Sequence, residues 1–125
     1  MKQILISTRG ISIKASLSDT PTAQEIFKIL PIKGKANVWG EEIYFTIPLE
    51  SGLEPDATQD MEVGALAYWP SGPALCIFFG PTPVSTGDKP RAYSPVNIIG
   101  QTIDDPAPLK TVRDGAEILI EALKK

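Results

Sequence analysis

Hydrophobic and polar residues alternate along the first part of the chain. In residues 11–17 every second side chain is apolar, as expected for a strand that buries one face. A preceding apolar segment is connected to this strand through Arg9 and Gly10, and glycine favours the tight turn that a hairpin requires. The sequence therefore predicts a half-buried β-hairpin at its start.

The spacing changes after this hairpin. The segment Asp19-Thr20-Pro21 supplies a helix cap and a proline that is tolerated in the first turn of a helix, and the apolar residues that follow recur at helical spacing until Pro31. We expect one short amphipathic helix over residues 21–30, because no other segment shows this spacing cleanly.

Residues 34–48 predict one strand pair, because residues 39–47 are rich in aromatic and β-branched side chains, with Gly40 as a bulge or a close approach of two backbones. Adjacent residues of a strand point to opposite faces, so Glu41 and Glu42 cannot act as a pair on one substrate. If the apolar face is the core, Glu41 lies at its edge and either accepts backbone hydrogen bonds or has a raised pKa. The two faces would carry, respectively, Trp39, Glu41, Ile43 and Phe45, and Glu42, Tyr44 and Thr46.

Two strongly apolar segments, residues 63–69 and 74–79, flank a Pro-Ser-Gly-Pro turn and predict a hairpin that is buried on both faces. Residues 96–103 again have strand character. Residues 116–123 permit a helix by propensity, but a turn sequence precedes them and the sheet needs a strand at its open edge, so we favour a strand. The predicted fold is a β-rich closed sheet.

Residues 80–95 contain four prolines and two glycines without periodicity, which predicts a long loop of the kind that often carries function. Aromatic residues at the neighbouring strand ends are either core or the walls of a shallow pocket that the prolines keep open. Arg91 is either a solvated charge or an anchor for a carboxylate or a peptide carbonyl. The candidate binding residues are Trp39, Glu41, Glu42, Tyr44, Tyr68, Trp69, Phe79, Pro81, Thr82, Arg91 and Asn97.

Composition narrows the functional classes. The 125 residues are 42% hydrophobic and 22% charged, which is ordinary for one globular domain spanning residues 1–125. The net charge is −3 and no basic cluster is present, so nucleic acid and membrane surfaces are not expected as partners. No apolar run is long enough for a signal peptide or a membrane span, and we expect a cytoplasmic protein.

The chain has no histidine, which excludes Ser-His-Asp and Cys-His nucleophiles and the usual nitrogen ligands of zinc or copper. Its single cysteine, Cys76, lies in an apolar run and is expected to pack in the core. Without a phosphate-binding loop or a Cys-x-x-Cys pair, we expect neither a cofactor nor a metal.

Three segments, residues 37–45, 64–83 and 94–100, resemble a small cyclophilin-like-fold family that occurs as uncharacterised hypothetical proteins in bacteria and archaea. The middle segment is long and distinctive, and the resemblance extends over nearly the whole chain. It implies a mainly β protein of prokaryotic type, with a closed eight-stranded cyclophilin-like β-barrel and one or two short helices. It also makes the C-terminal segment a strand.

True cyclophilins bind a proline-containing peptide in an apolar and aromatic pocket, beside an arginine, a histidine and a glutamine. This chain lacks histidine, and residues 39–45 carry two glutamates where an arginine-bearing strand would be expected, so no cyclophilin catalytic residue is carried over. The resemblance therefore predicts architecture and leaves the chemistry open.

Three functions remain as hypotheses. The first is a binding module that holds a small molecule or a short peptide in an aromatic and proline-lined pocket. The second is a weak or atypical peptidyl-prolyl cis-trans isomerase. The third is a structural subunit whose aromatic surface forms a homo-oligomer interface. A concave pocket with a buried carboxylate would favour the first, an arginine at the pocket the second, and a flat aromatic patch the third.

Overall fold

The computed structural model describes residues 2–123, which form ten strands, one α-helix and one short 3-10 helix. In chain order the elements are β1 (Lys2–Thr8), β2 (Ile11–Leu17), α1 (Pro21–Lys28), β3 (Ile32–Lys35), β4 (Asn37–Val38), β5 (Glu42–Thr46), β6 (Thr58–Asp60), β7 (Ala65–Trp69), β8 (Ala74–Phe78), β9 (Arg91–Thr102), η1 (Ala107–Thr111) and β10 (Glu117–Ala122). The protein is mainly β, as predicted.

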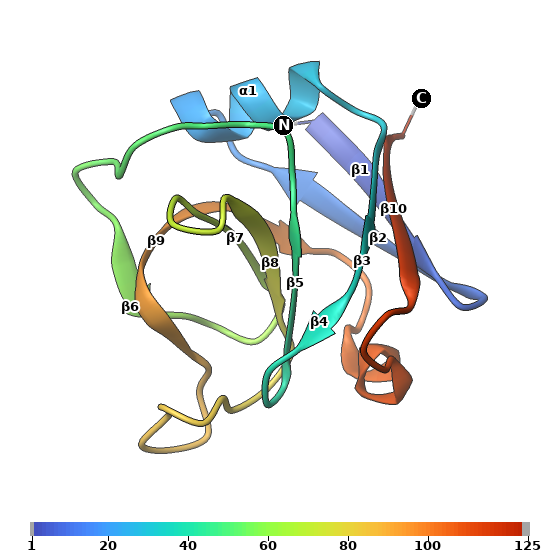
Figure 1. The fold of residues 1–125 in the computed structure, drawn as a ribbon, viewed down its shortest axis with the longest axis vertical. Coiled ribbons are helices and arrows are strands. Elements are labelled where there is room, and N and C mark those ends of the chain that lie inside the picture. The colour runs from blue at the N-terminus through green and yellow to red at the C-terminus, as the bar shows by residue number, and fades with distance from the viewer. Residues whose placement is uncertain (1, 124–125) are drawn as a thin grey trace.

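The strands form one antiparallel sheet in the order β3-β10-β1-β2-β9-β7-β8-β5-β4, and β6 pairs with β9 outside this order. The prediction of a closed eight-stranded barrel was wrong, because the two end strands, β3 and β4, do not pair with each other. They are successive parts of one extended stretch, separated only by Ala36, and cannot form a ladder between themselves. In Figure 1 β1, β2, β3 and β10 occupy one side of the molecule, while β5 to β9 curl around the other.

The hairpin of β1 and β2, the helix and the C-terminal strand are confirmed. Thr20 accepts a hydrogen bond from the backbone N–H of Ala23 at the start of α1, and the helix ends at Lys28, slightly earlier than expected. β10 pairs with β1 on one side and β3 on the other, which explains why this segment is a strand and not a helix. Tertiary pairing outweighs its helical propensity.

The predicted strand pair is present as β4 and β5, but residues 39–47 do not form one continuous strand. The predicted faces are correct for Ile43 and Phe45 and for Glu42 and Tyr44. The prediction was wrong for Trp39, which lies on the face of Glu42 and Tyr44. The backbone groups of Trp39 and Glu42 bond to each other at 2.9 and 3.2 Å, and this closes a two-residue turn at Gly40 and Glu41 between β4 and β5. Gly40 has a φ of +60°, which glycine adopts without strain. A Cβ at Gly40 would lie 2.8 Å from the Cα of Thr82, so the predicted close approach is confirmed.

The turn changes which side chains share a face. Trp39 and Glu42 lie opposite each other across the β4–β5 hairpin, and their side chains project to the same side, as those of cross-strand pairs do. Ile43 and Phe45 project to the opposite side, where both are fully buried.

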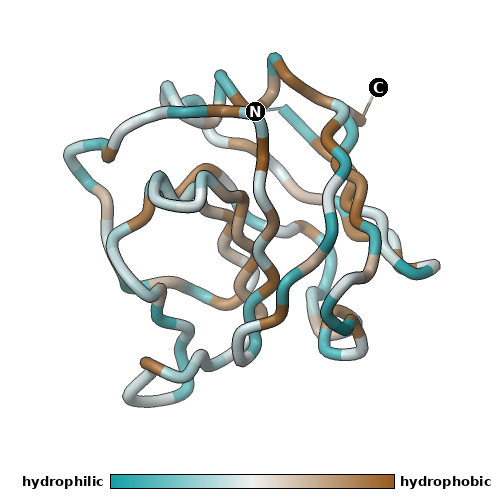
Figure 2. Tube along the Cα trace, in the orientation of Figure 1, coloured by the Kyte–Doolittle hydropathy of each residue, from teal (hydrophilic) through white to brown (hydrophobic). Residues whose placement is uncertain are grey.

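Two hydrophobic cores lie on opposite faces of β5, β7 and β8. The main core includes Ile43, Phe45, Leu66, Tyr68 and Ile77 and extends to β1, β2, β10 and α1. The small core is packed under β6 and β9 and consists of Met61, Ala65, Ala67, Cys76, Phe78, Ala92 and Val96, with Tyr44 and Trp69 packed against it. Figure 2 shows hydrophobic colour along β7 and β8, whereas the turn between β1 and β2 is hydrophilic. The prediction that β7 and β8 are buried on both faces is confirmed.

The two helices within residues 2–123 are short, and neither is long and apolar enough to cross a membrane.

Candidate functional site

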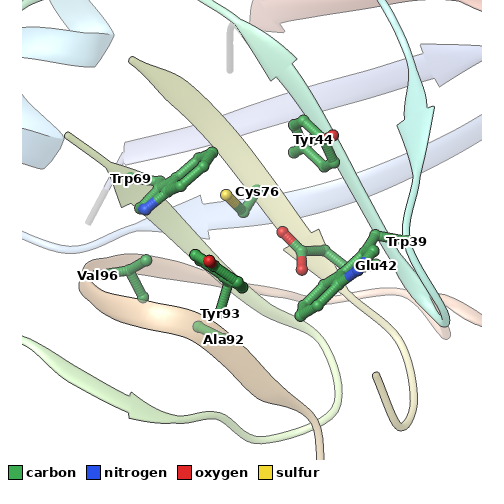
Figure 3. A pocket seen from close by; sticks show the side chains of 8 residues that line it. All are labelled: Trp39, Glu42, Tyr44, Trp69, Cys76, Ala92, Tyr93 and Val96. Atoms are coloured by element: carbon green, nitrogen blue, oxygen red, sulfur yellow. The ribbon is translucent and has the colours of Figure 1, made fainter. Parts of the chain in front are cut away.

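A pocket of about 170 Å³ opens on the outer side of the small core. Its walls are aromatic, and a carboxyl group and a thiol lie among them (Figure 3). The lining residues are Trp39, Glu42, Tyr44, Trp69, Cys76, Ala92, Tyr93 and Val96.

The strand pattern places these side chains. In the β5–β8 ladder Tyr44 lies opposite Cys76, and in the β7–β8 ladder Cys76 lies opposite Ala67, so Cys76 is at the centre of this face. Trp69 lies one alternate position beyond Ala67 on β7 and projects from the same face. The first half of β9 supplies the opposite wall, with Tyr93 at its rim.

Four aromatic rings form a connected series around the pocket. The ring centroids of Tyr44 and Trp69 are 6.3 Å apart, those of Trp69 and Tyr93 are 6.2 Å apart, and those of Tyr93 and Trp39 are 6.0 Å apart. The interplanar angles lie between 76° and 84°, so each ring stands nearly perpendicular to the next. This edge-to-face geometry is favourable between aromatic rings. It also means that the rings border the pocket in several different orientations.

Hydrogen bonding fixes one of these rings. The indole N–H of Trp69 donates to the hydroxyl of Ser94 at 2.8 Å, which orients the ring and occupies its only donor. Tyr93, in contrast, is 68% exposed and forms the outer edge of the pocket.

Glu42 is the acidic group of the site and is only 5% exposed. Burial raises its pKa to about 7, because a charged carboxylate loses its hydration among apolar walls. A hydrogen bond with the Cys76 thiol acts in the opposite direction but is the smaller influence. Burial also raises the pKa of Cys76 well above its usual range, with the nearby Glu42 carboxylate adding to the effect, so the thiol stays protonated.

Glu41 has a different environment. Its side chain is 37% exposed and lies 3.8 Å from the ammonium group of Lys110. Its backbone joins the turn to the following loop, because the N–H of Glu41 donates to Pro81 and its carbonyl accepts from Phe79, both at 2.9 Å. From the sequence we expected Glu41 to be the carboxyl group at the edge of the interior. In the structure the buried carboxyl group with a raised pKa is that of Glu42.

The structure brings four of the predicted binding residues together in the pocket, namely Trp39, Glu42, Tyr44 and Trp69. Tyr68 and Phe79 lie instead in the main core. The hydroxyl of Tyr68 donates to the Leu49 carbonyl at 2.7 Å, so this ring braces the loop after β5.

Asn97, Arg91, Thr82 and Pro81 lie outside the pocket lining. The amide of the fully buried Asn97 donates to Thr22 and Gly52 and accepts from the Glu54 N–H, which ties α1 to the loop before β6. The Arg91 guanidinium donates to Asp60 at 3.1 Å and to Gln59 at 3.2 Å. The Thr82 hydroxyl donates to the Arg91 carbonyl, whereas Pro81 is exposed on the loop.

Sequence reasoning missed Ala92, Tyr93 and Val96 and placed Cys76 only in the core. The predicted loop over residues 80–95 hid the start of β9, which begins at Arg91. The available signal was weak, because Ala92 and Val96 are apolar but the alternate position between them is the polar Ser94.

A family model described as Cyclophilin-like matches residues 2–121. The chain belongs to the Cyclophilin-like family. The resemblance inferred from the sequence is thereby confirmed. No protein among the curated sequences matches it.

Two solved structures resemble this Cyclophilin-like chain. The solution structure of the hypothetical protein AF2241 from Archaeoglobus fulgidus has 37% sequence identity and a TM-score of 0.82, and the match covers 98% of this chain and 95% of that one. A structure of McbB in complex with tryptophan has 16% identity and a TM-score of 0.66, and the match covers 98% of this chain and 45% of that one. The second likeness concerns the fold alone.

Proposed function

We propose that this Cyclophilin-like protein is a binding module for a small organic molecule, which occupies the pocket between the aromatic rings and contacts Glu42. The observation that supports this most strongly is the convergence of four rings, from three separate parts of the chain, on an open space. Trp39 and Tyr44 belong to the β4–β5 hairpin, Trp69 ends β7, and Tyr93 lies on β9. Side chains that serve only stability fill such a space completely.

The size of the pocket argues for a compact ligand. A cavity of about 170 Å³ is similar to the apolar cavities that accommodate a single benzene-sized ring. Drug-sized ligands occupy larger clefts, from about 300 Å³ upward. The expected ligand is therefore one ring or one compact branched group.

The pocket also has the property that distinguishes small-molecule binding from the two other hypotheses. It is concave and contains a buried carboxyl group, whereas an assembly surface would present a flat aromatic patch. A prolyl isomerase needs an oriented donor beside its apolar slot. Arginine is absent from the lining residues that the structure describes, and Arg91 is bonded to Asp60 and Gln59.

A fluorescence titration tests the binding function directly. The chain has two tryptophans, and both line the pocket, so intrinsic fluorescence reports on its occupancy without a label. A panel of single-ring and compact branched fragments is titrated against the wild-type protein and Tyr93→Ala. We expect some fragments to change the emission saturably and to bind Tyr93→Ala at least about fivefold more weakly, because a wall of the pocket is lost.

Ile98→Ala is the matched control. Ile98 is also exposed on β9, at 41%, but does not line the pocket, so its removal should leave fragment affinity unchanged. If no fragment gives a saturable change, or if Tyr93→Ala and Ile98→Ala weaken binding equally, the proposed function is wrong.

A further inference from the structure

The polar groups that line the pocket favour a ligand that carries donors and positive charge. Glu42 is the acidic member of the lining, and no lysine or arginine appears among the lining residues. Within residues 2–123 the ion pairs involve Glu25, Glu41, Asp60 and Glu62 but not Glu42. The indole donor of Trp69 is already bonded to Ser94. The carboxyl group therefore has no basic partner among residues 2–123.

The aromatic walls favour the same charge. The face of an aromatic ring carries the negative part of its quadrupole, and cations bind over it within about 6 Å of the centroid. Because successive rings from Tyr44 to Trp39 are nearly perpendicular, they surround a shared space from several directions. Several aromatic rings around a compact space are the arrangement that recognises quaternary ammonium groups.

Size and shape complete the argument. A space comparable to a benzene cavity accepts a tertiary or quaternary ammonium head with its methyl groups in contact with the rings. A bare metal cation is a poor fit, because no group of three or more His, Cys, Asp or Glu side chains within residues 2–123 is placed to hold one. An anion would meet both the carboxylate and the negative ring faces.

We infer that the pocket selects small organic cations of the alkylammonium class, with the four aromatic rings around the cationic head and the Glu42 carboxylate as its counter-charge. This inference rests on the proposed binding function and specifies the chemistry of the ligand.

Such a ligand couples binding to proton release. Besides Glu42, the titratable groups that line the pocket are the Cys76 thiol from β8 and the hydroxyls of Tyr44 from β5 and Tyr93 from β9; Trp39 and the β7 side chain Trp69 do not titrate. Arg91 on β9 is held by Asp60, outside the lining. Because the pKa of Glu42 is about 7, the empty pocket holds a protonated carboxyl below that pH, and a bound cation favours its ionised form.

Choline and 3,3-dimethylbutan-1-ol form a matched pair of probes, since they have the same branched shape and hydroxyl but only choline is charged. We expect choline to bind the wild-type protein about tenfold more tightly near pH 8, because cation–π contacts and the counter-charge add to the shared apolar contacts. We also expect its affinity to rise up to about tenfold between pH 6 and pH 8, whereas that of the alcohol stays constant. Isothermal titration calorimetry measures both affinities.

Glu42→Gln keeps the shape of the side chain and removes its charge. In this variant choline should lose about tenfold in affinity together with its pH dependence, so that its advantage over the alcohol disappears. Glu41→Gln is the control, because this neighbouring glutamate lies outside the pocket beside Lys110 and its change should affect neither probe.

The outcomes separate this inference from the proposed function. If the alcohol binds as tightly as choline, or if neither binds while neutral fragments do, the pocket binds apolar ligands and the cation inference is wrong although the binding function stands. If choline binds equally well to the wild-type protein and Glu42→Gln, the carboxylate does not act as its counter-charge and the inference is also wrong. If neither probe nor any fragment binds, both proposals fail.

Discussion

The two faces of β5, β7 and β8 are made from alternate residues of the same strands, yet they differ in almost every physical property. On the main-core face Phe45 and Ile77 are fully buried in the larger hydrophobic core. On the other face Tyr44 and Trp69 are half-buried, and Glu42 sits between aromatic walls. Five-residue strands can thus place close-packed apolar side chains on one face and an open, aromatic-walled pocket on the other, because a strand turns successive side chains to opposite sides.

This difference also explains why a carboxyl group is tolerated inside the protein. Burying a charged carboxylate is unfavourable, and protonation of Glu42 beside the pocket limits this free-energy cost. On the main-core face the same group would displace close-packed atoms. There the ring of Phe45 lies so close to Gly34 that a Cβ on the glycine would be 2.7 Å from it.

The largest expected effect distinguishes the two faces by stability. Phe45→Ala should lower the free energy of unfolding by about 3–5 kcal/mol, because it empties a fully buried site. Tyr44→Ala, the adjacent residue on the opposite face, should lower it by only about 1–2 kcal/mol, since its ring is half-buried. Urea unfolding followed by circular dichroism measures both. Equal losses would show that the pocket face is packed as tightly as the core.

The second effect is the pH dependence of stability. The pKa of Glu42 rises from 4.5 to about 7 on folding, so the folded state binds the proton more tightly. Proton binding to Glu42 therefore stabilises the folded state by roughly 3 kcal/mol below pH 4.5, and this stabilisation is lost as the pH rises to about 7. The stability of the wild-type protein relative to Glu42→Gln should therefore fall by this amount between about pH 4 and about pH 8.

Chemical denaturation at a series of pH values gives this difference, and other acidic groups cancel in the comparison. Glu41→Gln provides the reference, since it makes the same chemical change at the adjacent residue, whose side chain lies outside the pocket. A flat difference for Glu42→Gln would mean that water reaches the carboxylate freely.

The smallest expected effect concerns the rim. Tyr93→Ala should change the free energy of unfolding by no more than about 0.5 kcal/mol, because the side chain is 68% exposed and its loss leaves no cavity. A thermal melt compared with the wild-type protein tests this. A loss similar to that of Tyr44→Ala would mean that the rim belongs to the packed structure and that this ring contributes to stability.

The sequence predicted those elements whose local pattern agrees with their tertiary environment. The hairpin of β1 and β2, the helix that starts at Pro21 and the two-face burial of β7 and β8 all have a clear period or composition. The open sheet was not predicted. Whether a sheet closes depends on which strands lie at its two ends, here β3 and β4, and the local sequence pattern of a strand does not contain that information.

The site was predicted only in part for two physical reasons. The turn at Gly40 and Glu41 lies inside an aromatic run and lacks the usual Asn-Gly or Asp-Gly signal, so the predicted strand ran through it. The turn instead leaves Glu41 beside Lys110 and brings Trp39 onto the face of Glu42 and Tyr44. The start of β9 contains Pro95, and proline normally argues against a strand. Asn97, two residues later, is the first residue of β9 to pair with β7, so the proline precedes that ladder. In the pairing with β6 the proline falls in the irregular stretch between Arg91 and Val96.

The length of β9 has a consequence for how this protein family can diversify. Its first half, including Ala92, Tyr93 and Val96, borders the pocket and pairs only with the three-residue β6, whereas its second half pairs with β2 and β7 and contributes Ile99 to the main core. Substitutions in the first half can therefore reshape the pocket while the second half keeps the sheet in register. The shape of the pocket and the pairing of the sheet depend on the same strand but can change independently along it.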